Sequence, residues 1–183
     1  MLSYAFFILL ALTPQVFGQN SWNYAGEEYW NISTVEQCHG VRQSPININT
    51  SEVFDLYFYN QLGLKDYNLD VAGKLKNNGH TIVWTPTTAM GELTMPLLSG
   101  TYKFHSFHFH WGSHEQQGSE HTINGRALPM ELHLVHFNKK YTDIAEAKTK
   151  EDGIAVIAIL FQVSYETLFA DDVASNSMKV SGL

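Results

Sequence analysis

The chain has 183 residues, of which 44% are hydrophobic and 16% are charged, and its formal net charge at pH 7 is -7. This length and apolar content predict a single globular domain with a substantial core and argue against a disordered chain. An acidic balance without a basic run also argues against nucleic acid or an anionic membrane surface as a partner.

The N-terminal segment 1–18 has the pattern of a secretory signal peptide. An apolar run covers residues 4–12, and the small Gly18 precedes the cleavage expected before Gln19. The run is too short to span a bilayer as a helix, although the lack of Lys or Arg before it leaves a short membrane anchor as the alternative. Two sequons for N-glycosylation, Asn31-Ile32-Ser33 and Asn49-Thr50-Ser51, agree with a secreted glycoprotein.

The sequence pattern of residues 19–183 predicts a single, mainly β domain. Residues 22–40 are aromatic and irregular, and we expect them to form an N-terminal lobe against the main body. Gly, Asn and Pro residues separate the strand-like segments that follow, at 53–59, 68–75, 80–85, 102–111, 130–137 and 154–163. Only residues 141–148 have a helical pattern. We therefore predict one large, twisted, mostly antiparallel sheet with short peripheral helices.

Histidines in two of these strands predict a metal site. Alternate side chains of a strand share a face, so His108 and His110 point the same way, and His133 in the next strand is the natural third ligand. Three imidazole nitrogens without thiolates leave a coordination position of zinc open, which is typical of a catalytic site. For the pair His108 and His110 alone, hydrogen-bonded histidines in an aromatic core are an equal alternative.

Glu131 lies two residues before His133 and on the same face of the predicted strand. A carboxylate in this position can accept the second ring N–H of a ligating histidine, which fixes its tautomer and raises its basicity. The alternative is a solvated strand carboxylate. We read His121 and His136 as structural, because hydrogen-bonded histidines are common in a dense core.

Five short motifs occur along the chain: Gln43-Ser44-Pro45-Ile46-Asn47-Ile48, Asn77-Asn78-Gly79-His80, Phe107-His108-Phe109-His110-Trp111-Gly112, Gly118-Ser119-Glu120-His121-Thr122 and Glu131-Leu132-His133-Leu134-Val135-His136. In this order they resemble the α-class carbonic anhydrases, and the resemblance runs over residues 22–163. It implies reversible hydration of carbon dioxide to bicarbonate and a proton, with Zn2+ held by His108, His110 and His133 and with water as the second substrate.

The resemblance also implies roles for residues outside the ligand set. His80 resembles the proton shuttle of the family, Tyr24 a tyrosine that orders the active-site waters, and Glu120 a buried carboxylate that orients the hydroxyl of a threonine. The alternatives are a solvent-facing turn histidine for His80 and packing of the N-terminal lobe for Tyr24. The sequence departs from the family at Ser106, where Gln is more usual, and at Leu128, where an aromatic residue is more usual.

Beyond residue 163 the resemblance fades, and we expect that roughly the C-terminal third of the family domain is missing. That segment would supply the threonine, a partner for the sole cysteine, Cys38, and any C-terminal membrane anchor. The strand at 154–163 is apolar at each position from 154 to 161, which predicts an interior strand with two neighbours.

We therefore expect an open sheet edge in the chain 19–183, with poor solubility, weak zinc binding and slow turnover. The alternative function is a secreted carbonic-anhydrase-like binding protein that is catalytically impaired by truncation. A zinc hydrolase is less favoured, because no His-Glu-x-x-His helix is present.

Overall fold

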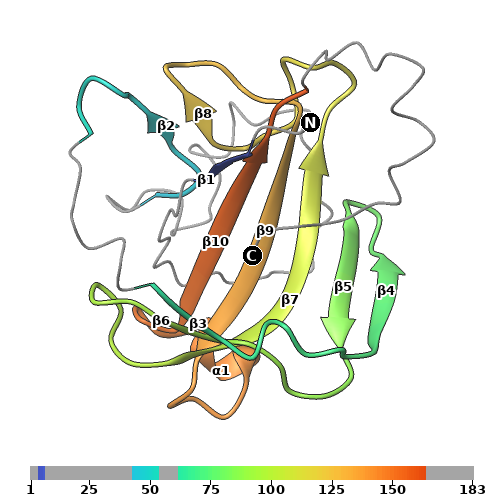
Figure 1. Cartoon of the computed structure of the whole chain (residues 1–183), viewed down its shortest axis with the longest axis vertical. Coiled ribbons are helices and arrows are strands. Elements are labelled where there is room, and N and C mark those ends of the chain that lie inside the picture. The colour runs from blue at the N-terminus through green and yellow to red at the C-terminus, as the bar shows by residue number, and fades with distance from the viewer. Residues whose placement is uncertain (1–3, 7–42, 54–61, 164–183) are drawn as a thin grey trace, which may run out of the picture.

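A computed structural model describes residues 4–6, 43–53 and 62–163 of the chain (Figure 1). Several predictions concern residues outside these ranges: most of the signal peptide, the N-terminal lobe, nearly all of the strand at 53–59, and the residues Tyr24, Asn31 and Cys38. Within the described residues the protein is mainly β, as the sequence predicts. This part of the chain contains no helix with the length and apolar character needed to cross a membrane.

Eight strands form one antiparallel sheet: β1 (Tyr4–Phe6), β3 (Gly63–Lys65), β4 (Gly73–Asn77), β5 (Ile82–Pro86), β6 (Glu92–Thr94), β7 (Tyr102–Trp111), β9 (Met130–Asn138) and β10 (Ile154–Phe161). The main path runs β1-β10-β9-β7-β5-β4, while β6 pairs with β7 and β3. Figure 1 shows the long strands β7, β9 and β10 side by side at the centre. A small parallel sheet joins β2 (Asn47–Ile48) to β8 (Thr122–Ile123), and α1 (Ile144–Ala147) is the helix of the described residues.

The long strands lie where the sequence predicts them, and the differences concern short or edge segments. β7 has the predicted bounds, whereas β4 begins at Gly73 because residues 68–72 form a turn and an irregular stretch. α1 is shorter than predicted and begins after Asp143, whose side chain accepts a hydrogen bond from the backbone N–H of Glu146. The strands β2, β3, β6 and β8 have two or three residues each. They were not predicted, because so few residues cannot show an alternating pattern.

A β-bulge in β7 decides which side chains share a face. Phe104 lies opposite His136 of β9, but Ser106 lies opposite Val135, so one extra residue is inserted at His105. Opposed residues of an antiparallel pair point to the same face. The bulge therefore places Phe104 on one face of the sheet and Ser106 on the other, although residues two positions apart in a regular strand share a face.

Beyond the bulge the pairing of β7 with β9 is regular. His108 lies opposite His133, and His110 lies opposite Glu131. The four side chains consequently share one face of the sheet, and two of the predicted ligands are direct cross-strand neighbours. The predicted orientation of His108 and His110 is confirmed.

The hydrophobic core lies on the other face. It consists of side chains from β6, the loop after it, β7 and β10: Leu93, Leu98, Tyr102, Ala155 and Ile157. Ala155 lies opposite His136 and Ile157 opposite Leu134, which places this cluster on the face away from His133. The hydroxyl of the fully buried Tyr102 donates a hydrogen bond to the backbone carbonyl of Asp152, at 2.7 Å. The core thus fixes β10 and β7 without contributing to the histidine face.

β10 pairs with β9 along its whole length, and five of its eight side chains are buried, which agrees with the predicted interior strand. Its other edge pairs with β1 over Ile159, Leu160 and Phe161. With residues 4–6 present, this edge of β10 is therefore covered at these three residues, whereas the open edge expected for the chain 19–183, which lacks β1, stays a prediction. The apolar N-terminal run supplies the added strand, because an extended segment can satisfy the backbone groups of a free edge. No described strand pairs with residues 154–158 on this side.

His136 is a buried histidine on the core face. Its Nε2 is hydrogen-bonded to the Tyr67 hydroxyl, and the Phe104 ring meets it edge-on with ring centroids 5.5 Å apart. Burial lowers the pKa of His136 to about 4 and raises the pKa of Tyr67 above its usual value. The side chain is neutral at pH 7 and packs as an aromatic group, as the structural interpretation of the sequence assumed.

We expect the contribution of His136 to stability to decrease as the pH is lowered from about 6.5 to 4, by up to about 1.4 kcal/mol per pH unit. In this window an unfolded histidine binds a proton, whereas the folded side chain stays neutral until the pH reaches about 4. Urea unfolding at several pH values measures the slope. His136→Phe should lower it by about one bound proton. Equal slopes in the wild type and His136→Phe would contradict the assignment.

Candidate metal centre

Three histidines converge on the face opposite the core. The ring centroids of His108 and His110 are 5.0 Å apart, those of His108 and His133 are 5.1 Å apart, and those of His110 and His133 are 4.6 Å apart. Each ring offers one nitrogen, and the three nitrogens lie within 4.8 Å of one another. The structure thus brings together the three residues that strand periodicity singled out.

The environment keeps His108 and His110 neutral. Burial, followed by the neighbouring His133, lowers the pKa of His108 to about 4. The same causes, with His108 itself, lower the pKa of His110 to about 3. A neutral imidazole has one nitrogen with a free lone pair, and this is the form that binds a metal ion.

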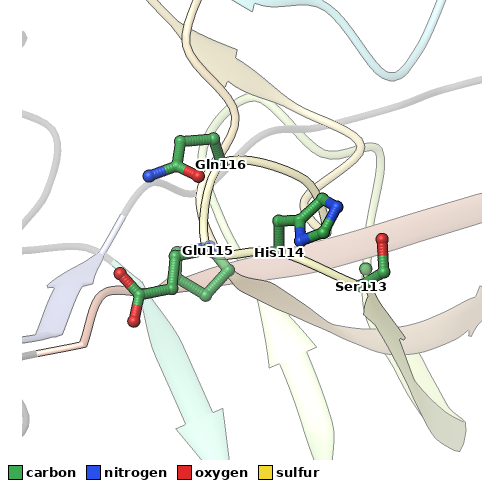
Figure 2. A pocket seen from close by; sticks show the side chains of 6 residues that line it. Ser113, His114, Glu115 and Gln116 are labelled. Carbon is green, nitrogen blue, oxygen red and sulfur yellow. The ribbon is translucent and has the colours of Figure 1, made fainter.

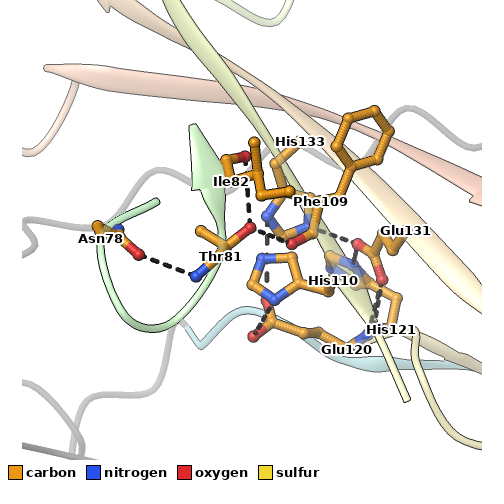
Figure 3. A network of polar contacts seen from close by, with 9 residues as sticks. All are labelled: Asn78, Thr81, Ile82, Phe109, His110, Glu120, His121, Glu131 and His133. Atoms are coloured by element: carbon orange, nitrogen blue, oxygen red, sulfur yellow. Dashed lines mark hydrogen bonds and ion pairs between the residues drawn. The ribbon is translucent and has the colours of Figure 1, made fainter. Parts of the chain in front are cut away.

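His133 is oriented by Glu131, as predicted. The Nε2 atom of His133 donates a hydrogen bond to Oε1 of Glu131 at 2.6 Å, and the two side chains come from the same face of β9 (Figure 3). An ionised carboxylate only accepts, so the proton of the neutral ring is on Nε2. Nδ1 therefore carries the lone pair and is the atom that His133 can offer to a metal ion.

Glu131 is fully buried and satisfied by other residues besides His133. Its Oε1 accepts a second hydrogen bond from Nδ1 of His121 at 2.5 Å, and its Oε2 accepts the backbone N–H groups of Glu120 and His121, each at 2.8 Å. Burial by itself would raise the pKa of Glu131, but the hydrogen bonds from His121 and His133 outweigh it and hold this pKa well below its usual range. The carboxylate is consequently ionised in the folded protein.

His121 has a more specific place than a general core histidine. Its Nε2 lies 3.3 Å from the hydroxyl of Ser44, so the ring connects the Ser44-Pro45 motif to Glu131 and through it to His133. Sequence reasoning missed this connection. No periodic signal could have shown it, because Ser44, His121 and Glu131 come from three separate segments.

Glu120 lies beside two of the converging histidines. Its Oε1 is 3.1 Å from Nδ1 of His110, and its Oε2 is 3.9 Å from Nδ1 of His133 (Figure 3). The contact with His110 favours the tautomer with the proton on Nδ1, which leaves Nε2 for a metal ion. Two of the three imidazoles therefore have a carboxylate at one nitrogen and a lone pair at the other.

His108 differs from these two histidines in its surroundings. Ser106, two residues before it, stands where the family more usually has Gln, and its hydroxyl lies 2.9 Å from Nδ1 of His105. His105 is the inserted residue of the bulge, so its ring can approach the neighbouring side chain. The hydroxyl of Ser106 is thus engaged away from His108.

His80 is exposed at the turn between β4 and β5. The backbone N–H groups of His80 and Thr81 donate to Oδ1 of Asn78, at 2.9 and 2.8 Å. Exposure agrees both with a shuttle and with a simple turn histidine. Tyr24, the third residue that the resemblance places in the active site, lies outside the described residues.

Apolar side chains lie next to the histidines on the same face. Val135 follows His133 by one alternation on β9, and the residues opposite this pair on β10 are Val156 and Ala158. The face of the sheet therefore changes from polar to apolar between β7 and β10. Such a border can hold a small uncharged molecule beside a metal ion.

The hollow in Figure 2 is a different part of the surface. It lies beyond the end of β7 and is lined by Gly112, Ser113, His114, Glu115, Gln116 and Pro129. Five of the six residues are exposed, and none belongs to the histidine cluster. The histidine cluster is therefore the stronger candidate for a functional centre.

Comparison with known proteins gives the family. Residues 25–181 match the family model of the eukaryotic-type carbonic anhydrases. The chain is 36% identical over 155 residues to human carbonic anhydrase 7, 37% over 170 residues to mouse carbonic anhydrase 6, and 34% over 154 residues to human carbonic anhydrase 3.

These alignments cover 81%, 85% and 79% of the chain and 58%, 51% and 57% of the respective relatives. The chain thus spans a little more than half the length of the proteins it matches. The order of the motifs, the convergence of the histidines and the match to the family agree with one another. The chain belongs to the eukaryotic-type carbonic anhydrases.

Proposed function

We propose that this chain carries the zinc site of a carbonic anhydrase and takes part in the reversible hydration of carbon dioxide to bicarbonate and a proton. The observation that supports the proposal most directly is the convergence of His108, His110 and His133 in a member of this family. Three of the most similar relatives have the name carbonic anhydrase.

The donor set suits zinc. His108 and His110 are neutral at pH 7, the ring of His133 has one nitrogen bonded to Glu131, and the three residues include no thiolate. Three imidazoles leave room for water, in contrast to a closed structural site. Zinc bound there lowers the pKa of a coordinated water to about 7, which supplies a nucleophile at neutral pH.

The remaining residues of this face are proposed to orient the groups at the centre and to bind the substrate. Glu131 fixes the ring of His133. Glu120, beside His110, is proposed to orient the hydroxyl of a threonine, which is the role that the resemblance implies. Val135 and Val156 form the apolar side that receives carbon dioxide. Tyr24 is proposed to order the waters between the centre and His80.

His80 is proposed to export the proton. Histidine is the side chain that gains and loses protons near neutral pH, and the ring of His80 is exposed to buffer. Its neighbour Thr81 lies within hydrogen-bond distance of Phe109, between two of the proposed ligands. This contact keeps the turn that carries His80 beside the strand that carries His108 and His110.

We also propose that the protein is secreted, with a signal peptide over residues 1–18 and glycans at Asn31 and Asn49. Asn49 is partly exposed in the turn after β2, and its side-chain oxygen accepts hydrogen bonds from the backbone and the hydroxyl of Ser51, at 3.2 and 2.8 Å. Cleavage before Gln19 would remove β1 from the edge of β10.

The first prediction concerns the ligands. Replacing His108, His110 or His133 by Ala should lower zinc affinity well over tenfold, because losing a ligand costs at least as much as the ~10–100-fold typical of residues that orient ligands. Glu131→Gln should fall within that ~10–100-fold range. Competition with a chromophoric chelator measures the affinity. The exposed His114 provides the control, His114→Ala, which should bind zinc as the wild type does. Stoichiometric zinc in the three ligand variants at micromolar protein would show the assignment to be wrong.

The second prediction concerns the reaction. The zinc-loaded chain should hydrate carbon dioxide in a stopped-flow assay with a pH indicator, and a chelator or His110→Ala should reduce the rate to that of buffer. His114→Ala should retain the wild-type rate. A zinc-loaded wild type with no activity above buffer would exclude turnover by this chain and favour a binding role.

The third prediction concerns the shuttle. His80→Ala should lower kcat about tenfold or more in weak buffer and leave kcat/KM for carbon dioxide nearly unchanged, because proton export follows the chemical step. Added imidazole should restore kcat. An equal loss in kcat and kcat/KM would assign His80 to the chemical step or to the fold.

A further inference from the structure

The turn that carries His80 is closed by hydrogen bonds between its two ends. The backbone N–H of Asn78 donates to the carbonyl of Thr81 at 3.1 Å, and Oδ1 of Asn78 accepts the N–H groups of His80 and Thr81. Gly79 has a φ of 90°, a conformation that glycine adopts readily, and its N–H donates to the side chain of Asn77 at 2.9 Å. The turn is consequently an ordered unit rather than a loose loop.

This unit is attached to the histidine strand through Thr81. The register of β5 and β7 comprises Val83 opposite His108 and Trp84 opposite Phe107. Nearer the turn, the Thr81 hydroxyl donates to the backbone carbonyl of Phe109 at 2.5 Å (Figure 3). The hydroxyl thus continues the connection between the strands beyond the last pair of the register.

The acceptor of this hydrogen bond, the Phe109 carbonyl, lies beside the proposed metal ligands. Phe109 lies between His108 and His110, two of the proposed ligands, and Thr81 immediately follows His80. Thr81 is only 8% exposed, so water competes poorly for this hydrogen bond. One partly buried hydrogen bond therefore joins the residue after the proposed shuttle to the backbone between the proposed ligands.

We propose that Thr81 is a positioning residue that holds His80 at a fixed place relative to the three-histidine centre through its hydrogen bond to Phe109. The inference rests on the proposed function, since it concerns the proton path of that centre. Sequence reasoning did not single out Thr81, because a threonine at the start of a strand is common and its partner is 28 positions away.

Replacement of a positioning residue should leave the metal centre intact, whereas replacement of a structural residue should disturb it. Phe109 also lies opposite Leu132 of β9, and the pairing of β7 with β9 extends to both sides of it. This pairing holds the ligand strand without help from Thr81. Loss of the hydroxyl should therefore loosen the turn and leave the metal centre intact.

The test compares Thr81→Val, which keeps the shape and removes the hydroxyl, with Thr81→Ser, which keeps the hydroxyl. Thr85→Val is the matched control, because Thr85 lies on the same strand and its side chain makes no hydrogen bond to another described residue. Each full-length variant is loaded with Co2+, which imidazole ligands bind as they bind zinc. Paramagnetic relaxation of the His80 ring protons then reports how the ring is held relative to the metal.

We expect Thr81→Val to change the relaxation of the His80 ring and to lower kcat in weak buffer about fivefold, the factor that corresponds to one hydrogen bond. Added imidazole should restore kcat. Co2+ affinity and kcat/KM should stay within about twofold of the wild type, because the metal centre stays intact. A change of that size is small compared with the effect of losing one hydrogen bond. Thr81→Ser and Thr85→Val should resemble the wild type in all measurements.

Wild-type relaxation and kcat in Thr81→Val would overturn the inference and leave the proposed function standing. Parallel losses of Co2+ affinity and kcat/KM would also overturn it, because they indicate a structural role. Failure of the wild type to bind Co2+ would remove the proposed function and this inference with it. If Thr81→Val does not fold, Thr81→Ala is compared in the same way, with the same outcomes.

Discussion

The histidine face depends on one buried charge, the carboxylate of Glu131. An ionised carboxylate removed from water costs several kcal/mol unless donors surround it. His121, His133 and two backbone N–H groups supply those donors. These hydrogen bonds hold the segment before β8 against β9, and one of them fixes the ring of His133, which β9 presents to the metal site.

The same contacts connect distant parts of the chain. Ser44 reaches His121 from the segment before β2, and the backbone of Glu120 places the Glu120 side chain beside His110. Stability and function therefore share their hydrogen bonds in this region. Any change that releases Glu131 from its donors would disturb the small sheet, the ring of His133 and the second carboxylate together.

The sheet separates two kinds of environment. One face carries the core with Tyr102 and the aromatic group of Phe104, Tyr67 and His136, while the other carries the histidine centre. The bulge at His105 makes this separation possible, because it changes the face of the following residues of β7. The rigid aromatic side can then support neutral histidines that are close enough to share a metal ion.

The sequence by itself determined the strands β7, β9 and β10, the shared face of His108 and His110, and the pairing of Glu131 with His133. These follow from the two-residue period of a strand, which is a local property of the backbone. The motifs in their order also determined the family. The third histidine, His133, favoured a metal site over hydrogen-bonded core histidines, because three imidazoles can share one zinc ion.

Only the tertiary structure decided which distant groups meet. The bulge, the bond of His121 to Glu131, the contact of Glu120 with His110, the bond of Thr81 to Phe109 and the pairing of β1 with β10 could not be read from the sequence. Each depends on the register of two segments or on the path of a loop. Such contacts form once the core and the buried charge have fixed the strands, and no local pattern of residues records them.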